Sequence, residues 1–480
     1  MKLQTFSLLI TIFFSHLCFG QEIKSNCLNN FINNPAYANS EIGLLVVDLN
    51  TEEIIFENNA HTSMVPGSIL KLPTSAAALE ILGEHYRFKT ELAYSGDINP
   101  ESGELAGDLV IIGGGDPTLG SEYFNNYPPN SNFPDTWIDS VVAAGISKVN
   151  GNIILDGTIY EGQTVPNTWI WEDIGNYYGA GASAISVYDN MFRITFMSAS
   201  AGEPTRIISI NPEVNGLELV NKVISSNDNR DLAYVFGSPW VGKKIIRGTI
   251  PKNRREFTIR ASMPEPGLVL GNDLIEGLRE KGVEIKGRVV KGKSNNKVLK
   301  LLLEQKSPRL SEIVKVMNHE SINLFAEHLA KQIAYEKNGY GSTETGVGLI
   351  KQFWAGKGID THGMFLEDGS GLSHFNAITP RQVVDILLFM KNSSSHSRVF
   401  ENSLPSPGEG TLYVFDPDNF PNGSLKCKSG SMTRVRCYAG YLTTDSGREL
   451  AFSFMANNFE GSHQNIISII EQVLIELRKD

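Results

Sequence analysis

Three short motifs carry side chains that together could activate a serine. They are Ser68-Ile-Leu-Lys71, Ser321-Ile-Asn323 and Lys428-Ser-Gly430, in this order along the chain. A serine hydroxyl is a poor nucleophile until a neighbouring base takes its proton. Residues three apart share one face of a helix, so Lys71 can point at the Ser68 hydroxyl. A lysine that is buried beside another cation titrates at a lower pH than a free one, and Lys428 could supply that second charge.

The context of the first motif separates it from a second copy of the same pattern. Ser294-Asn-Asn-Lys297 lies in a polar, turn-like stretch. Ser68 instead precedes an Ala- and Leu-rich run that ends near Leu82, which predicts a buried helix with its positive end beside the serine. Pro73 has no N–H and is expected to kink or delay the first turns. Ser68 could also be an ordinary helix N-cap, but the other two motifs favour catalysis.

The second and third motifs have structural alternatives as well. In the catalytic interpretation, Ser321 relays a proton to a leaving amine and Asn323 donates to a substrate carbonyl. In the alternative, both residues cap the helix predicted over residues 324–330. Lys428 could likewise be a solvated lysine on an edge strand.

The sequence gives little support for nucleotide binding or for a metal site. The segments 287–294 and 113–120 are rich in glycine, but the first has a strand-like centre and the second is a sharp turn, so neither predicts a nucleotide site. His319 and His328 are interpreted as structural, and no zinc motif is present. We therefore expect neither a metal nor another cofactor.

Charge and the first residues indicate an exported protein. The 480 residues carry a net charge of −11 with no basic stripe, which argues against nucleic acid as a partner. Residues 1–20 resemble a secretory signal, with Lys2 before the apolar run 6–14 and cleavage after Gly20. No later run is long enough to cross a bilayer. We expect a periplasmic protein without a transmembrane span, and loose membrane association stays open.

Three cysteines remain after signal cleavage. Cys427 and Cys437 flank a predicted hairpin and could form a disulfide across it, or they could be reduced, buried thiols. Cys27 has no evident partner. The sequence leaves the state of this pair open.

The two ends of the chain predict one domain of the α+β class. Residues 42–57 read as strand, turn and strand, residues 435–455 as two further strands, and residues 466–477 as an amphipathic helix. This pattern predicts an antiparallel sheet flanked by helices and built from both termini. Residues 88–303 differ, because tight turns separate short β-rich runs.

The chain therefore divides into a signal peptide, residues 1–20, and two further parts. Residues 21–87 and 304–480 form the domain with the three motifs, and residues 88–303 form a mostly-β insertion, interpreted as two nested domains.

With these motifs the chain resembles the D-alanyl-D-alanine carboxypeptidase/endopeptidase family that includes penicillin-binding protein 4. The resemblance extends over nearly all of the mature chain. Beyond the three motifs, it includes Gly114-Gly-Asp-Pro117, Trp169-Ile-Trp-Glu-Asp-Ile174, Asp368-Gly-Ser-Gly-Leu-Ser373 and Ala439-Gly-Tyr441. It implies a β-lactamase/transpeptidase-like catalytic domain with inserted domains.

The resemblance also implies roles for individual residues. Ser68 would be the acylated serine and Lys71 its base, with Ser321 and Asn323 as a second wall. Lys428, Ser429, Gly430 and Ser431 would form the strand that faces the terminal carboxylate of the substrate. The N–H groups of Ser68 and Ser431 would form the oxyanion hole. Asp156 would meet the amino group of the third residue of the peptide. His374 departs from the family, in which arginine is common at this position.

The function implied is that of a serine DD-peptidase. It would act on peptidoglycan stem peptides through an acyl-enzyme on Ser68 and would be inhibited covalently by penicillin and other β-lactams. The balance of carboxypeptidase and endopeptidase action and the oligomeric state stay open. The alternatives are a serine β-lactamase or esterase of the same superfamily, and a non-catalytic cell-wall-binding protein.

Overall fold

A computed structural model describes residues 29, 31–124, 133–294 and 298–479. The predicted signal peptide and Cys27 lie outside the described residues. Within these ranges, no helix is both long enough and apolar enough to cross a membrane.

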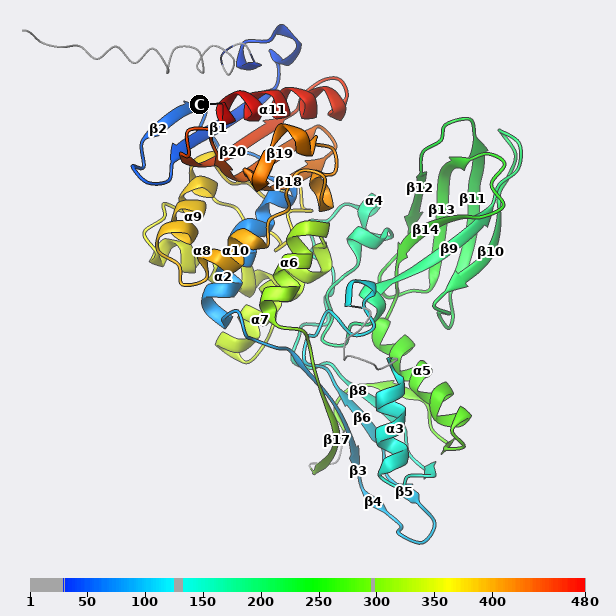
Figure 1. Cartoon of the computed structure of the whole chain (residues 1–480). Coiled ribbons are helices and arrows are strands. Elements are labelled where there is room, and N and C mark those ends of the chain that lie inside the picture. Colours follow the sequence, from blue (N-terminus) through cyan, green and yellow to red (C-terminus); the bar gives the residue numbers. More distant parts are fainter. Residues whose placement is uncertain (1–28, 30, 125–132, 295–297, 480) are drawn as a thin grey trace, which may run out of the picture.

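One five-stranded antiparallel sheet joins the two ends of the chain, as predicted (Figure 1). Its order is β18-β19-β20-β1-β2, and β1 pairs with β20 over its full length. The strands are β1 (Glu41–Asp48), β2 (Ile54–Asn58), β18 (Leu425–Met432), β19 (Val435–Thr443) and β20 (Glu449–Asn457). One face packs against the C-terminal helix α11 (His463–Arg478), and the other packs against the remaining helices of this region. The predicted α+β class is confirmed.

Helix α2 (Lys71–Leu82) lies at the centre of the helical layer. Its Ala-rich sequence presents little side-chain bulk, so the surrounding helices can approach it closely, and nine of its residues, from Lys71 to Leu79, are buried. The other helices of the layer are α6 (Leu310–Glu320), α7 (Asn323–Asn338), α8 (Thr343–Gly356), α9 (Pro380–Asn392) and α10 (Ser397–Asn402). Helix α2 is therefore fixed from all sides.

Pro73 delays the α-helix and does not kink it. A short 3₁₀ turn, Gly67–Leu70, comes first, and the α-helix begins at Lys71. Pro73 is the third residue of that helix, where the backbone N–H would have no intrahelical acceptor. Ser68 thus lies in the tight turn that leads into the helix.

The insertion leaves and rejoins the catalytic region through two paired strands, β3 (Lys89–Ser95) and β17 (Leu299–Lys306). Both belong to the sheet β16-β8-β6-β3-β17, beside a smaller sheet β15-β7-β5-β4. The other strands of this group are β4 (Asp97–Ile98), β5 (Glu104–Ala106), β6 (Leu109–Ile112), β7 (Lys148–Val149), β8 (Ile153–Asp156), β15 (Glu284–Ile285) and β16 (Val289–Lys291). Strand β16 lies within the glycine-rich segment 287–294, which confirms its strand-like centre.

A second group of inserted strands forms two three-stranded sheets, β10-β9-β14 and β11-β13-β12. They are β9 (Met191–Met197), β10 (Arg206–Asn211), β11 (Glu218–Ser226), β12 (Leu232–Phe236), β13 (Lys243–Pro251) and β14 (Phe257–Ser262). The insertion also contains the helices α3 (Asp135–Ala143), α4 (Trp171–Ile174) and α5 (Pro266–Glu280). It is therefore less purely β than the turn-rich sequence indicated, because α5 packs an amphipathic face against the first group.

Of the two alternatives that the sequence left open for Cys427 and Cys437, the structure shows reduced thiols and no disulfide. In the hairpin of β18 and β19, Cys427 pairs with Gly440 and Cys437 pairs with Gly430. The two side chains point to opposite faces of the sheet and belong to different cores, because side chains alternate along a strand. Both are buried free thiols, and burial raises the pKa of each.

We expect alkylation to label Cys427 and Cys437 only after unfolding. Iodoacetamide applied to the folded protein should leave both thiols unmodified, because their side chains are inaccessible to solvent. The same reagent in denaturant without a reductant should modify both, as measured by peptide mass spectrometry. A disulfide-linked pair of the two peptides would contradict the strand register.

Candidate active site

The three motifs meet at one cleft of about 1100 Å³ between the catalytic region and the insertion. Ser68 lies in the turn before α2, the second motif at the junction of α6 and α7, and the third on β18. The motif residues that line the cleft are Ser68, Ser321, Ile322, Asn323 and Ser429, and Ser431, directly after the third motif, lines it as well. Tertiary packing thus unites segments separated by more than 100 positions in the sequence.

Lys71 is held beside Ser68 by three hydrogen bonds. Its Nζ donates to Ser68 Oγ at 3.1 Å, to Asn323 Oδ1 at 2.6 Å and to the Ser370 carbonyl at 2.7 Å. A neutral amine has two N–H groups and one lone pair. If the two shorter contacts use the N–H groups, the lone pair is left facing the Ser68 hydroxyl, which is the arrangement a general base needs.

Burial is the main reason that Lys71 can be neutral. The side chain is fully inaccessible to solvent, and desolvation lowers the pKa of Lys71 to about 7, against the opposing effect of the negative charges on Asp368 and Glu327. The sequence argument assigned part of this effect to Lys428. Instead, burial and repulsion by Lys71 lower the pKa of Lys428 itself well below its ordinary value.

The structure does not support the alternatives of helix capping for Ser321 and Asn323 or of a solvated Lys428. No side chain caps the start of α7, and Lys428 is not exposed to solvent. Lys428 is fully buried, and its Nζ donates to Ser321 Oγ at 2.9 Å and to the Ser429 carbonyl at 2.8 Å. Ser321 ends α6 with a left-handed φ of 58°, which turns the chain so that α7 can begin at Asn323. The Asn323 side chain bonds Lys71 and, through Nδ2, the Tyr178 carbonyl at 2.8 Å.

Two glycines allow β18 to lie directly against the turn that carries Ser68. A Cβ on Gly430 would lie 2.4 Å from the Pro66 carbonyl oxygen and 3.0 Å from the Ser68 nitrogen. Gly67 has a φ of 51°, and its own Cβ would lie 3.1 Å from the Ser431 nitrogen. The backbone nitrogens of Ser68 and Ser431 therefore lie on one wall, as an oxyanion hole requires.

The segment from Asp368 to Asn376 forms the floor behind Lys71. Asp368 is buried, and its oxygens accept hydrogen bonds from the N–H groups of Gly371 at 2.7 Å and Ser373 at 2.6 Å, and from Asn376 Nδ2 at 2.8 Å. A fourth donor is Trp169 Nε1 at 2.8 Å. The motif Asp-Gly-Ser-Gly-Leu-Ser in the sequence marked this segment as part of the family resemblance. The sequence did not predict that Asp368 binds the backbone of the segment that carries Ser370.

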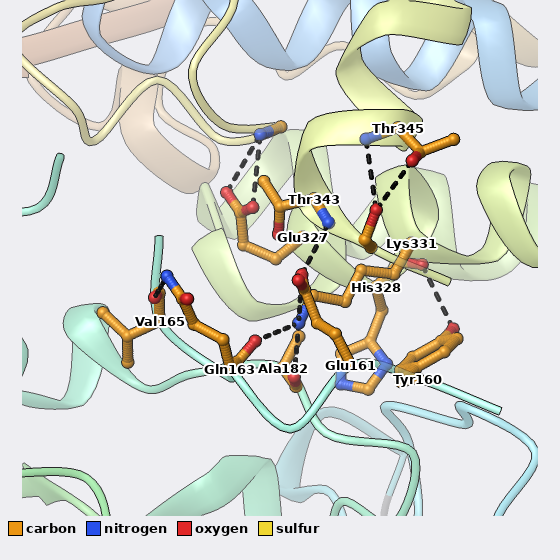
Figure 2. A network of polar contacts seen from close by, with 12 residues as sticks. Tyr160, Glu161, Gln163, Val165, Ala182, Glu327, His328, Lys331, Thr343 and Thr345 are labelled. Carbon is orange, nitrogen blue, oxygen red and sulfur yellow. Dashed lines mark hydrogen bonds and ion pairs between the residues drawn. The ribbon is translucent and has the colours of Figure 1, made fainter. Parts of the chain in front are cut away.

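Helix α7 carries charged groups toward both the active site and the insertion (Figure 2). Glu327 accepts from the Gly369 N–H at 3.1 and 3.2 Å, and burial together with the charge of Asp368 raises the pKa of Glu327 to about 8. One turn later, Lys331 is also buried and donates to the Gln163 carbonyl at 2.7 Å, with Glu161 at 3.3 Å. The helix thus joins the floor of the site to the insertion.

The insertion contributes three acids to the cleft, Glu172, Asp173 and Asp189, and Asp156 is not one of them. Asp156 ends β8, where its Oδ1 accepts from the Thr158 N–H at 3.1 Å, and it is not among the residues that line the cleft. Asp173 lines the cleft together with Tyr178 and His374. Burial raises the pKa of Asp173, partly offset by a hydrogen bond from Tyr178 and by the charge of His374.

His328, on α7, is a structural residue, as the sequence indicated. His328 is buried, with its ring nitrogens at 2.8 Å from the Gly115 carbonyl and 3.0 Å from Ser186 Oγ. Burial lowers the pKa of His328 to about 3, so the ring is neutral and structural. Among the residues that the structure describes, no cluster of three or more His, Cys, Asp or Glu could hold a metal ion.

Comparison with known proteins agrees with this geometry. A model of the D-Ala-D-Ala carboxypeptidase 3 (S13) family matches residues 24–476. The chain belongs to this family. It is a serine-type carboxypeptidase of the DD-peptidase kind, which confirms the resemblance found in the sequence.

Individual members of the family are similar over nearly their whole length. The D-alanyl-D-alanine carboxypeptidase of Actinomadura sp. (strain R39) is 31% identical over 450 residues, which cover 90% of this chain and 81% of the relative. The D-alanyl-D-alanine carboxypeptidase DacB of Haemophilus influenzae is 24% identical over 88% of this chain and 86% of that relative. The crystal structure of penicillin-binding protein 4 from Haemophilus influenzae has the same fold, with a TM-score of 0.79, 21% identity and coverage of 96% of this chain and 100% of that one.

We expect the rate of acylation to rise with pH until Lys71 is neutral. A lysine with a pKa of about 7 is protonated below that pH and cannot accept the serine proton. The second-order rate constant with a fluorescent penicillin should therefore fall about tenfold per pH unit below this pKa and level off above it. A rate that stays constant from about pH 5.5 to 8 in folded protein would contradict the assignment of Lys71 as the base.

Proposed function

We propose that this member of the S13 family cleaves the terminal D-Ala-D-Ala bond of peptidoglycan stem peptides through an acyl-enzyme on Ser68. The observation that carries the proposal is the buried amine of Lys71, with two acceptors for its N–H groups and the Ser68 hydroxyl at 3.1 Å.

The acylation step follows from this arrangement. Lys71 takes the proton of Ser68 as its Oγ attacks the carbonyl carbon between the two D-alanines. The N–H groups of Ser68 and Ser431 stabilise the oxyanion. The C–N bond then breaks, and the departing D-alanine amine receives a proton through Ser321, which Lys428 polarises. Water later hydrolyses the ester and returns the enzyme to its starting state.

Lys428 has a second role at the end of the substrate. Its amine, when protonated, suits the terminal carboxylate of a peptide, together with the hydroxyl groups of Ser429 and Ser431, which line the cleft. A penicillin presents a carboxylate and a strained amide to the same groups. One crystal structure of Haemophilus influenzae penicillin-binding protein 4, which shares the fold at a TM-score of 0.76, is described as a complex with a β-lactam. We propose the same class of covalent inhibitor for this chain.

The site of action follows from the substrate and from the sequence. Peptidoglycan lies outside the cytoplasmic membrane, and residues 1–20 have the pattern of a cleaved signal peptide. We therefore propose a periplasmic enzyme. Its catalytic domain comprises residues 21–87 and 304–480, and the inserted domains comprise residues 88–303, with β17 extending the boundary to Lys306.

Replacing Ser68 should abolish covalent labelling. Ser68→Ala removes the only atom that can form the ester, so no penicillin adduct should be found by intact-protein mass spectrometry. Ser294→Ala is the matched control, because Ser294 begins the other Ser-x-x-Lys pattern and is not among the residues that line the cleft. It should be labelled at the wild-type rate. Labelling of Ser68→Ala, or loss of labelling in Ser294→Ala, would refute the proposal.

We further propose that Asp173 selects peptides with an amine on the side chain of the third residue. It replaces Asp156 in that role, because Asp173 lines the cleft and Asp156 does not. A carboxylate beside a bound ammonium group supplies a charge-assisted hydrogen bond.

Asp173→Asn should lower kcat/KM for a peptide with such an amine by about ten- to a hundredfold, the value of one charged contact. The same change should have little effect on a peptide whose amine is acetylated. Asp156→Asn is the control and should cleave both peptides like the wild type. Equal losses on both peptides in Asp173→Asn would show that Asp173 is structural.

A further inference from the structure

Both acceptors that orient Lys71 are themselves held by the insertion. The Asn323 side-chain oxygen and the Ser370 carbonyl bind the Lys71 amine at 2.6 and 2.7 Å. Each belongs to the catalytic region, yet each is tied to a residue between Trp169 and Tyr178. The insertion therefore contacts the environment of the base as well as the cleft.

The first connection sets the orientation of Asn323. A side-chain amide has a donor end and an acceptor end, and a partner at one end fixes the direction of the other. The Tyr178 carbonyl accepts from Asn323 Nδ2 at 2.8 Å. The oxygen of Asn323 is thereby turned toward Lys71.

The second connection fixes the position of Ser370. Asp368 binds the N–H groups of Gly371 and Ser373, so it folds the short segment that presents the Ser370 carbonyl. Trp169 is only 5% exposed, and its Nε1 donates to the remaining position on Asp368 Oδ2 at 2.8 Å. Without this donor, a buried charged oxygen would lose one of its partners, which is costly.

We propose that Trp169 is a positioning residue for Lys71, so that the insertion takes part in acylation as well as in substrate recognition. Trp169 acts through Asp368 and the Ser370 carbonyl and touches neither substrate nor the reacting atoms. The proposal rests on Lys71 as the base in the proposed function.

The hydrogen bond from Trp169 to Asp368 also affects the protonation of Lys71. The titratable groups that face Lys71 are Asp368 and Glu327, which favour its protonated form, and Lys428, whose own pKa is lowered by burial and by repulsion from Lys71. The N–H dipole of Trp169 offsets part of the charge on Asp368. Removing the dipole leaves Asp368 more negative toward Lys71, and the protonated, inactive form of the base persists to higher pH.

The test compares Trp169→Phe with Trp137→Phe in the full-length protein. Phenylalanine keeps an aromatic ring and removes the N–H group. Trp137 is also a fully buried tryptophan of the insertion, but its Nε1 has no hydrogen-bond partner among the residues that the structure describes, so Trp137→Phe controls for the loss of indole packing. The readout is the second-order rate constant of acylation by fluorescent penicillin from about pH 5.5 to 9.

Trp169→Phe should acylate about tenfold more slowly than the wild type at pH 7. The acidic limb of its pH profile should move to higher pH, with partial recovery of the rate near pH 9. Trp137→Phe should keep the wild-type profile. A wild-type rate for Trp169→Phe would overturn the proposal, and so would an equal loss at every pH, because a purely structural defect does not move the profile.

A second variant covers the case in which Trp169→Phe fails to fold. Replacing Trp169 by benzothienylalanine keeps the shape of the indole and exchanges only the N–H group for sulfur. The same shift of the pH profile supports the proposal, and an unchanged profile overturns it. Failure of the proposed function is recognised separately, because it would appear as labelling of Ser68→Ala.

Discussion

The rest of the active site depends on the burial of one amine, that of Lys71. Lys71 is wholly buried, and this burial brings its pKa to about 7, so that a primary amine can serve as a base near neutral pH. An exposed lysine would remain protonated. Helix α2 achieves the burial with alanines, which let the five other helices of the layer and the sheet surround it. The reactivity of Ser68 therefore depends on how tightly the helical layer is packed.

Burying an amine requires that every polar atom around it has a partner. A buried polar group without a hydrogen bond costs about 1–3 kcal/mol, and more if it is charged. Asp368 meets this demand with four donors, and Glu327 with the N–H of Gly369. One turn farther along α7, Lys331 is bound by carbonyls and a carboxylate of the insertion (Figure 2). The polar network is continuous from the catalytic lysine to the inserted residues.

This continuity explains how a large insertion can follow so closely after the nucleophile. Strands β3 and β17 pair with each other, so the chain leaves and returns at one place and does not disturb the five-stranded sheet. The inserted segment from Trp169 to Tyr178 then returns to the cleft, where it contacts Asp368 and Asn323. In the roles that we propose, recognition of the peptide and orientation of the base depend on the same short stretch of chain. A change in the insertion can in this way alter catalysis without touching Ser68.

The sequence by itself determined the elements and the reactive residues, because both are encoded locally. The Ser-x-x-Lys spacing, the Ala-rich run of α2 and the strand-and-turn pattern of β1, β19 and β20 depend on neighbours a few positions away. They sufficed to predict the α+β fold, the sheet built from both ends and the three motifs that meet at the cleft.

Only the tertiary structure decided which of several similar residues take part. The register of β18 and β19 places Cys427 and Cys437 on opposite faces, and a one-residue shift would have exchanged those faces. The fold brings Asp173 into the cleft and leaves Asp156 at the end of β8. Burial, which sequence spacing does not measure, sets the pKa of Lys71. Contacts such as that of Trp169 with Asp368 join positions 199 residues apart, and only packing can select them.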